Sequence, residues 1–168
     1  MAKKIIQLMV SRVFPAYHKR KGEPTDFNQK IKEKEKHHTL RANYERWKNK
    51  IDQVNRGEAV LSVREWQGVP YHSKQNYLFY YNETDNLDVS KVTKDEDGFL
   101  INDSIRVTEE ELAKNDGLSL EDFREWFKII PSEPMAMIHL DSFRYGDTKC
   151  KNNFLKTNKL NQNGKSQN

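Results

Sequence analysis

The segment that decides the interpretation of this chain is Lys36-His37-His38-Thr39-Leu40-Arg41. It places an amine, two imidazoles, a hydroxyl and a guanidinium around one apolar side chain, Leu40. Charged groups packed among aliphatic residues lose solvation that nothing replaces, so the segment is a poor candidate for a core strand. We interpret it as the wall of a polar pocket, with a solvated basic strand as the alternative.

The composition predicts one soluble domain. The chain has 168 residues, of which 35% are hydrophobic, which is enough for one core and too little for two domains. It has no apolar run of about 18 residues and no secretory cleavage pattern, so we expect a soluble cytoplasmic protein without membrane contact. Its single cysteine, Cys150, has no partner for a disulfide within the chain. We take a monomer as the default.

The charges are divided along the chain. Residues 1–50 hold 14 Lys or Arg against 5 Asp or Glu, a net charge of +9. Residues 82–127 hold 5 against 14, a net charge of −9. If the basic part forms one face, it attracts phosphate-bearing partners such as RNA. If the two parts pack together, the charges offset each other and no partner follows.

Apolar periodicity and capping residues predict alternating strands and helices. The clearest helix lies between Asn43, a good N-cap, and Gly57. Thr108 and Ser119 each precede an acidic residue by three positions, which indicates two further helix starts. We expect strands at 4–14, 59–66, 77–81, 99–101 and 135–140, a short helix around 27–31, a mobile loop near the pocket at 16–25 and an irregular acidic segment at 82–97.

This order of elements favours an α+β fold, a small mixed or antiparallel β-barrel with helices packed on its outside. We expect the domain to span residues 1–146. Residues 147–168 are rich in Asn, Lys and Gln, which predicts a polar, disordered tail. We assign Trp47 and Trp126, which lie on helix faces, to packing.

Over residues 4–145 the chain resembles the ASCH family of the PUA-like β-barrel superfamily, and in particular ASCH-type proteins of bacteria and phage. The resemblance rests on three motifs in order: Lys36-x-x-Thr39-x-Arg41, the strand 59–66 after a helix, and Asp116-Gly117-Leu118-Ser119-Leu120 at the late helix. It implies a PUA-like barrel with a cleft that binds RNA or a nucleotide.

The resemblance also implies a catalytic alternative. Small ASCH members that hydrolyse 4-acetylcytidine use a Lys and a Thr from this pattern and a Glu before the late helix, which implies catalytic roles for Lys36, Thr39 and Asp116. Two features depart from the family: Asp116 is one methylene shorter than Glu, and Glu33-Lys34-Glu35 replaces the glycine common ahead of the Lys.

The residue types in this pattern suit acyl transfer. A Thr hydroxyl becomes a nucleophile when a neighbouring base takes its proton. An amine such as that of Lys36 can do so when desolvation or a nearby cation, here Arg41, lowers its pKa. Asp116 would orient the amine or carry a proton. The alternative interpretation makes Thr39 an ordinary strand residue and Lys36 a surface amine.

The same residues suit a ligand pocket. Arg41 and Lys36 can hold a phosphate or a base edge, and aromatic rings such as Trp66, Tyr71 or Tyr77 can cover a base face, although packing in the core is the alternative for most of these rings. The residues we predict to bind the ligand are Arg41, His38, His37, Arg64, Trp66, Ser73 and Lys74.

Neither a metal nor a cofactor is expected. His37, His38, His72 and His139 lack the spacing of metal ligands. A third class, a protein-interaction module without a ligand, predicts an exposed apolar patch instead of a basic pocket.

Overall fold

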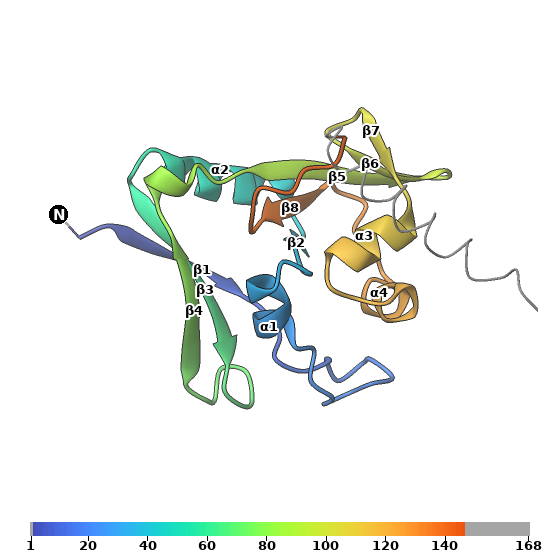
Figure 1. The fold of residues 1–168 in the computed structure, drawn as a ribbon, viewed down its shortest axis with the longest axis horizontal. Helices are drawn as coiled ribbons and strands as arrows, with labels where there is room; N and C mark the ends of the chain where they lie inside the picture. The colour runs from blue at the N-terminus through green and yellow to red at the C-terminus, as the bar shows by residue number, and fades with distance from the viewer. Residues whose placement is uncertain (1, 147–168) are drawn as a thin grey trace, which may run out of the picture.

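The structure is a computed structural model and describes residues 2–146; the predicted tail at 147–168 lies outside the described residues. Its fold is α+β, as predicted (Figure 1). The elements in chain order are β1 (Lys4–Met9), α1 (Phe27–Lys32), β2 (His38–Arg41), α2 (Tyr44–Asn55), β3 (Ala59–Trp66), β4 (Gln75–Tyr81), the 3₁₀ helix η1 (Glu83–Asp85), β5 (Val89–Asp95), β6 (Gly98–Ile101), β7 (Ile105–Val107), α3 (Glu109–Asn115), α4 (Leu120–Trp126) and β8 (Met135–His139).

The first sheet has three strands in the order β1-β3-β4. β1 runs parallel to β3, from Lys4 opposite Ala59 to Met9 opposite Arg64, and β4 runs antiparallel to β3. Parallel neighbours need a crossover connection, and α2 forms the last part of the connection from β1 to β3. This helix packs against β3, β5 and β8. The core between α2 and this sheet includes Ile51 and Leu61.

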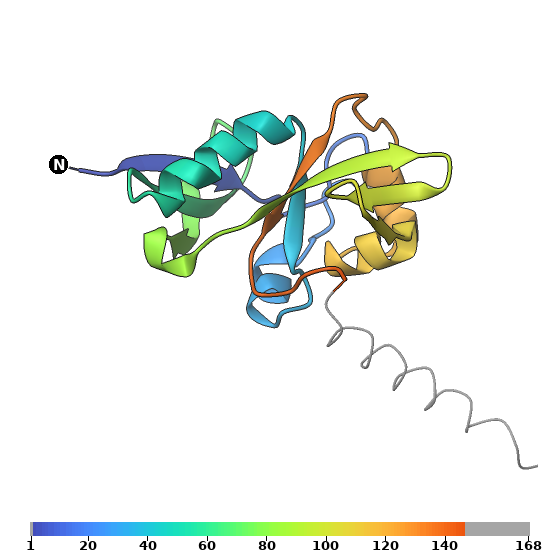
Figure 2. The same cartoon turned by 90° about the horizontal axis from the view of Figure 1, so that it is seen from above.

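The second sheet has five antiparallel strands in the order β2-β8-β5-β6-β7. Helices α3 and α4 cover one end of it and contribute Leu112 and Phe123 to a second apolar core around Phe99. Strands β2 and β8 lie in the middle of the molecule, between the first sheet and helices α3 and α4 (Figures 1 and 2). Residues of the first sheet and residues of helices α3 and α4 can therefore both contact β2.

The expected closed PUA-like barrel is not confirmed. Within residues 2–146 no strand pairing joins the two sheets. The end of β1 is instead connected to β2 by a side chain, because the Arg41 guanidinium donates a hydrogen bond to the carbonyl oxygen of Met9.

The helix predictions are confirmed by the capping groups. The Asn43 side chain accepts a hydrogen bond from the Arg46 amide, and Gly57 follows α2 with a φ of 75°. Thr108 forms a reciprocal capping box at α3. At α4 only half of the predicted box forms: Ser119 accepts from the amide of Asp122, whose carboxylate turns to Arg20.

The bounds of the first predicted strand and the prediction of an irregular acidic segment are both wrong. The strand expected at 4–14 ends at Met9, after which the chain enters an irregular segment. The segment expected to be irregular at 82–97 contains β5, in which Ser90 and Val92 are buried and their neighbours are not. Strand β7 was also not expected. Among the described residues, no helix is long and apolar enough to cross a membrane.

Candidate functional site

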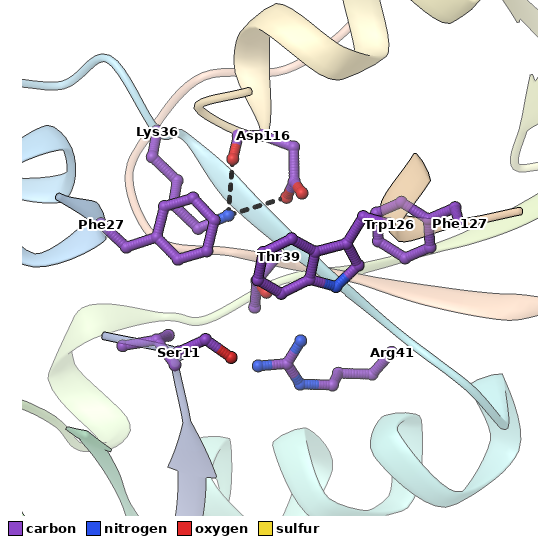
Figure 3. A pocket seen from close by; sticks show the side chains of 9 residues that line it. Ser11, Phe27, Lys36, Thr39, Arg41, Asp116, Trp126 and Phe127 are labelled. Carbon is purple, nitrogen blue, oxygen red and sulfur yellow. Dashed lines mark hydrogen bonds and ion pairs between the residues drawn. The ribbon is translucent and has the colours of Figure 1, made fainter. Parts of the chain in front are cut away.

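The three residues predicted to be catalytic lie around one pocket. Lys36 forms an isolated bridge with Asp116, the C-cap residue of α3, while Thr39 lies in β2. Successive side chains of a strand point to opposite faces, so Thr39 and Arg41 share one face of β2. The pocket is lined by Val10, Ser11, Phe27, Lys36, Thr39, Arg41, Asp116, Trp126 and Phe127 (Figure 3).

Lys36 and Asp116 form a buried ion pair. The amine lies 2.9 Å from Asp116 Oδ1 and 2.7 Å from its carbonyl oxygen, and the two residues are only 1% and 3% exposed. The amine also lies 4.2 Å from the centre of the Phe27 ring. Burial lowers the pKa of Lys36, and the Asp116 carboxylate opposes this only in part. Burial raises the pKa of Asp116, but the Lys36 amine and the neighbouring His38 imidazole bring it below its usual value. The Asp116 carboxylate is therefore ionised at neutral pH, with the Lys36 amine within ion-pair distance.

The glycine after Asp116 makes room for this pair. Gly117 has a φ of 76°, a conformation that side chains disfavour. A Cβ atom at this position would lie 3.0 Å from the Cβ atom of Lys36. Glycine is thus favoured at position 117 for two reasons: the backbone conformation and the close approach of Lys36.

Behind the carboxylate lies a second row of polar groups. His38, fully buried, has its Nδ1 atom 3.4 Å from Asp116 Oδ1 and its Nε2 atom 2.9 Å from the hydroxyl of Tyr145. Asn115 donates to the same hydroxyl at 3.1 Å. Burial lowers the pKa of His38 and raises the pKa of Tyr145, so the imidazole is neutral and the phenol keeps its proton. This arrangement favours Nδ1–H directed at Asp116 and a Tyr145 hydroxyl that donates to Nε2.

Two groups in the pocket have unused hydrogen-bonding capacity. Thr39 is buried, and within residues 2–146 no group hydrogen-bonds to its hydroxyl. Arg41 donates to the carbonyl oxygens of Leu40 and Met9, and in the described part of the chain it has no carboxylate partner. Burial lowers the pKa of Arg41, which still stays charged at neutral pH. Two basic side chains, Lys36 and Arg41, and one carboxylate, Asp116, therefore line the pocket.

The pocket is narrow. It offers about 20 Å³ to water-sized molecules, which is room for one or two waters. The rings of Phe27, Trp126 and Phe127 form its apolar walls (Figure 3). Since Phe27 is buried whereas Trp126 and Phe127 are partly exposed, an organic ligand would enter by displacing the latter two.

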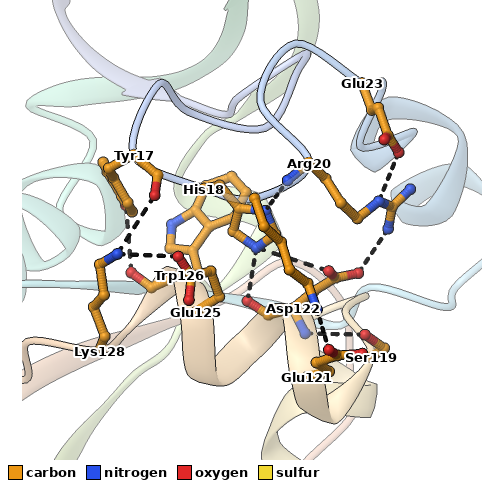
Figure 4. A network of polar contacts seen from close by, with 11 residues as sticks. Tyr17, His18, Arg20, Glu23, Ser119, Glu121, Asp122, Glu125, Trp126 and Lys128 are labelled. Atoms are coloured by element: carbon orange, nitrogen blue, oxygen red, sulfur yellow. Dashed lines mark hydrogen bonds and ion pairs between the residues drawn. The ribbon is translucent and has the colours of Figure 1, made fainter.

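The position of Trp126 depends on a set of contacts that we call the clasp: those between the loop at 15–23 and the segment from Ser119 to Lys128 (Figure 4). Arg20 lies 2.7 Å from Asp122 Oδ2, and His18 lies 3.2 Å from the Asp122 carbonyl oxygen. The Tyr17 hydroxyl donates to the Trp126 carbonyl oxygen at 3.3 Å. The loop therefore lies near the pocket, as predicted, and is fastened to α4.

Ion pairs link the basic and acidic parts of the chain. Lys19 pairs with Glu121, Arg20 with Asp122, and Lys36 with Asp116. Each pair joins a residue of the basic region to one of the acidic region. The alternative in which the two charged regions offset each other therefore applies at these positions.

The structure does not bring most of the predicted ligand-binding residues to this pocket. His38 lies behind Asp116, as described above. His37 pairs with Asp141 at 2.7 Å and stacks on Phe143. Arg64 donates to Ser62 and Gln75 on the first sheet. Trp66, Ser73 and Lys74 belong to the β3–β4 hairpin, so of the seven residues only Arg41 lines the pocket.

Sequence reasoning gave no site role to Tyr145 or to five residues that line the pocket: Val10, Ser11, Phe27, Trp126 and Phe127. Trp126 was assigned to packing, and it does pack on Phe14 and Phe27, yet it also lines the pocket. Tyr145 follows the last strand, and no spacing in the sequence connects it to His38. Within residues 2–146 no group of three or more His, Cys, Asp or Glu side chains could hold a metal ion.

Comparisons of the chain with models of known protein families, with curated proteins and with solved structures find no match. The resemblance to the ASCH family therefore stays a prediction, and the geometry of the pocket has to support any function.

Proposed function

We propose that this protein is an ASCH-type, PUA-like domain whose pocket binds a nucleotide-like ligand, either free or as part of an RNA. The observation that carries the proposal is the combination in one pocket of aromatic walls and more basic than acidic side chains. A planar base can stack on Trp126 or Phe127, as bases stack on aromatic side chains in single-stranded RNA recognition.

Arg41 gives the pocket its preference for an anion. Its guanidinium is held by two backbone carbonyl oxygens and has no carboxylate partner among the described residues. A planar guanidinium with free N–H groups suits a phosphate better than a point charge does. The ligand must therefore carry an anionic group, or develop one during a reaction.

Thr39 supports a second candidate function, hydrolysis of an acylated cytidine. Its hydroxyl is free to react and shares the pocket with an amine whose pKa burial lowers. In this reaction the neutral form of Lys36, which the lowered pKa makes more abundant, takes the Thr39 proton, and the oxygen attacks the acyl carbon to form an oxyanion near Arg41. The C–N bond then breaks as the leaving nitrogen receives the proton, and water hydrolyses the acyl-threonine.

Calorimetric titration with cytidine, cytidine monophosphate and a short single-stranded RNA tests the binding proposal. We expect the phosphorylated ligands to bind more tightly than cytidine and the affinity for RNA to fall with salt. Arg41→Ala should weaken binding of the monophosphate at least about tenfold, the effect of losing a hydrogen bond to a charged group. Arg46→Ala, a change on the exposed face of α2, is the control. No binding of any of the three ligands at low salt would overturn the proposal.

Turnover of 4-acetylcytidine tests the second candidate. Thr39→Val keeps the shape of the side chain and removes its hydroxyl, so it should abolish turnover and leave ligand binding within about threefold. Thr39→Ser should restore part of the rate. Turnover that survives Thr39→Val would remove Thr39 from the mechanism. If the wild-type protein binds 4-acetylcytidine but does not hydrolyse it, only the binding function would remain.

A further inference from the structure

Strand β4 is an edge strand of unusual composition. Its seven residues, Gln75-Asn76-Tyr77-Leu78-Phe79-Tyr80-Tyr81, contain no charged residue, no proline and no glycine. Five of them are aromatic or aliphatic. Segments of this length with high β-propensity and no charge pair readily with further strands.

One side of β4 has no partner. The order β1-β3-β4 leaves the strand at the edge of the first sheet, and among the described residues the backbone of β4 pairs with β3 alone. Figure 1 shows β4 along the outer side of the molecule, away from the second sheet. Proteins usually protect such an edge with lysine, proline or a cover. Strand β4 has neither lysine nor proline. The one irregularity in its pairing is a register shift beside Arg64.

The exposed side chains of β4 form an apolar surface. Tyr77 and Tyr80 are 60% and 56% exposed, and their rings lie nearly parallel with centres 6.3 Å apart. Ile5, on β1 of the same sheet, is also exposed. These rings would be covered in part if the sheet continued beyond β4.

The charges at the two ends of β4 are opposite. Lys74 precedes the strand, whereas Glu83, which pairs with Lys3, and Asp85 follow it in η1. We propose that β4 pairs antiparallel with β4 of a second copy of this chain, which joins two three-stranded sheets into one of six strands. A twofold axis then brings the basic end of each strand beside the acidic end of the other, twice in one dimer. Parallel pairing would bring like charges together.

Sedimentation velocity of the whole chain, over about two orders of magnitude in concentration, tests this inference. We expect the mass to rise from one chain to two. Tyr80→Lys places a charge on the edge and should raise the dissociation constant at least about tenfold. Tyr71→Lys is the matched control, because Tyr71 is 85% exposed but lies in the loop before β4. A wild-type protein that stays monomeric, or that forms open-ended polymers, overturns the proposal.

Charge reversal tests the antiparallel arrangement. Lys74→Glu and Glu83→Lys should each weaken the dimer, and the two changes in one chain should restore it. Glu83→Lys also removes the exposed pair with Lys3, which contributes little to folding. Failure of the double variant to dimerise would overturn the antiparallel assignment. This inference does not depend on the pocket or on its ligand.

Discussion

Two buried aspartates, six residues apart, have the same kinds of partner and different surroundings. Asp116 ends α3 and faces a lysine and a histidine, Lys36 and His38. Asp122 lies in the first turn of α4 and faces an arginine and a histidine, Arg20 and His18.

The difference lies in the cations. The side chain of Lys36 is 1% exposed, whereas that of Arg20 is 40% exposed and reaches Asp122 from a surface loop. The first carboxylate borders a cavity that also contains the free Thr39 hydroxyl. The second belongs to the clasp. Residue type alone therefore does not separate a candidate site from a structural contact, but burial of the cation and an adjacent cavity do.

The largest expected effect is that of Lys36→Met. This change leaves the Asp116 carboxylate buried without its amine, and breaking a buried pair on one side typically destabilises by about 3–5 kcal/mol. Urea denaturation measures the free energy of unfolding. Arg20→Met, the same change at the other aspartate, should lose only a small fraction of that amount because the arginine is open to water.

A double variant separates the charge from the packing at Lys36. Lys36→Met combined with Asp116→Asn removes both charges and should recover at least half of the lost stability. If the double variant is as unstable as Lys36→Met alone, the lost packing of the long side chain explains the effect, and the contrast between the two aspartates is weaker than we infer.

Gly117→Ala should have the next largest effect. The strained backbone conformation and the contact with Lys36 together predict a loss of about 1–3 kcal/mol. Gly22→Ala is the control, since Gly22 has a similar φ of 81° with nothing within 4 Å of the added atom. The difference between the two variants in thermal denaturation measures the crowding at Lys36, and equal losses would contradict a tight approach there.

Asp122→Asn should destabilise the protein by at most about 1 kcal/mol, because the ion pair it removes is partly exposed. Its effect on the pocket is more informative. With the clasp loosened, Trp126 should become more accessible, so acrylamide quenching of tryptophan fluorescence should increase. Glu110→Gln, at an exposed position of α3, should leave the quenching unchanged.

The smallest expected effect is on the pH dependence of the stability of Asp122→Asn. Burial raises the pKa of Asp122, but the hydrogen bonds of Arg20 and Ser119 bring it below its usual value. A carboxylate with a lowered pKa in the folded state stabilises the fold above its unfolded pKa of about 3.9 and loses that contribution as the pH falls further. The stability difference between wild type and Asp122→Asn should therefore shrink as the pH falls from about 5 to below 3. A constant difference would contradict the ion pair.

Local signals in the sequence predicted the helices and some of the strands. The capping residues Asn43, Thr108 and Ser119 act as expected because caps depend on neighbours in sequence. Strand β3 has its predicted bounds. Strand β5 escaped prediction because its buried face holds Ser90 as well as Val92, and the surrounding acidic residues hide the alternation.

The candidate site was predictable only in part. The motif that contains Lys36 and Thr39 predicted one side of the pocket, and the Asp116-Gly117 pair predicted the other. Trp126 and Tyr145 reach the site through tertiary contacts that no periodicity records. The separation of Arg64 and Trp66 from the pocket also depends on the first sheet standing apart from β2.

The parallel pairing of β1 with β3 has a consequence for the order of folding. The first strand cannot reach its place until residues 59–66 have been synthesised, and about 50 residues must be closed into a loop when it does. Until then Ile6 and Leu8 have no sheet to cover them. Contacts so distant in sequence slow folding. The N-terminal strand is therefore expected to join the native structure after the local pairings β3–β4, β5–β6 and β6–β7 have formed.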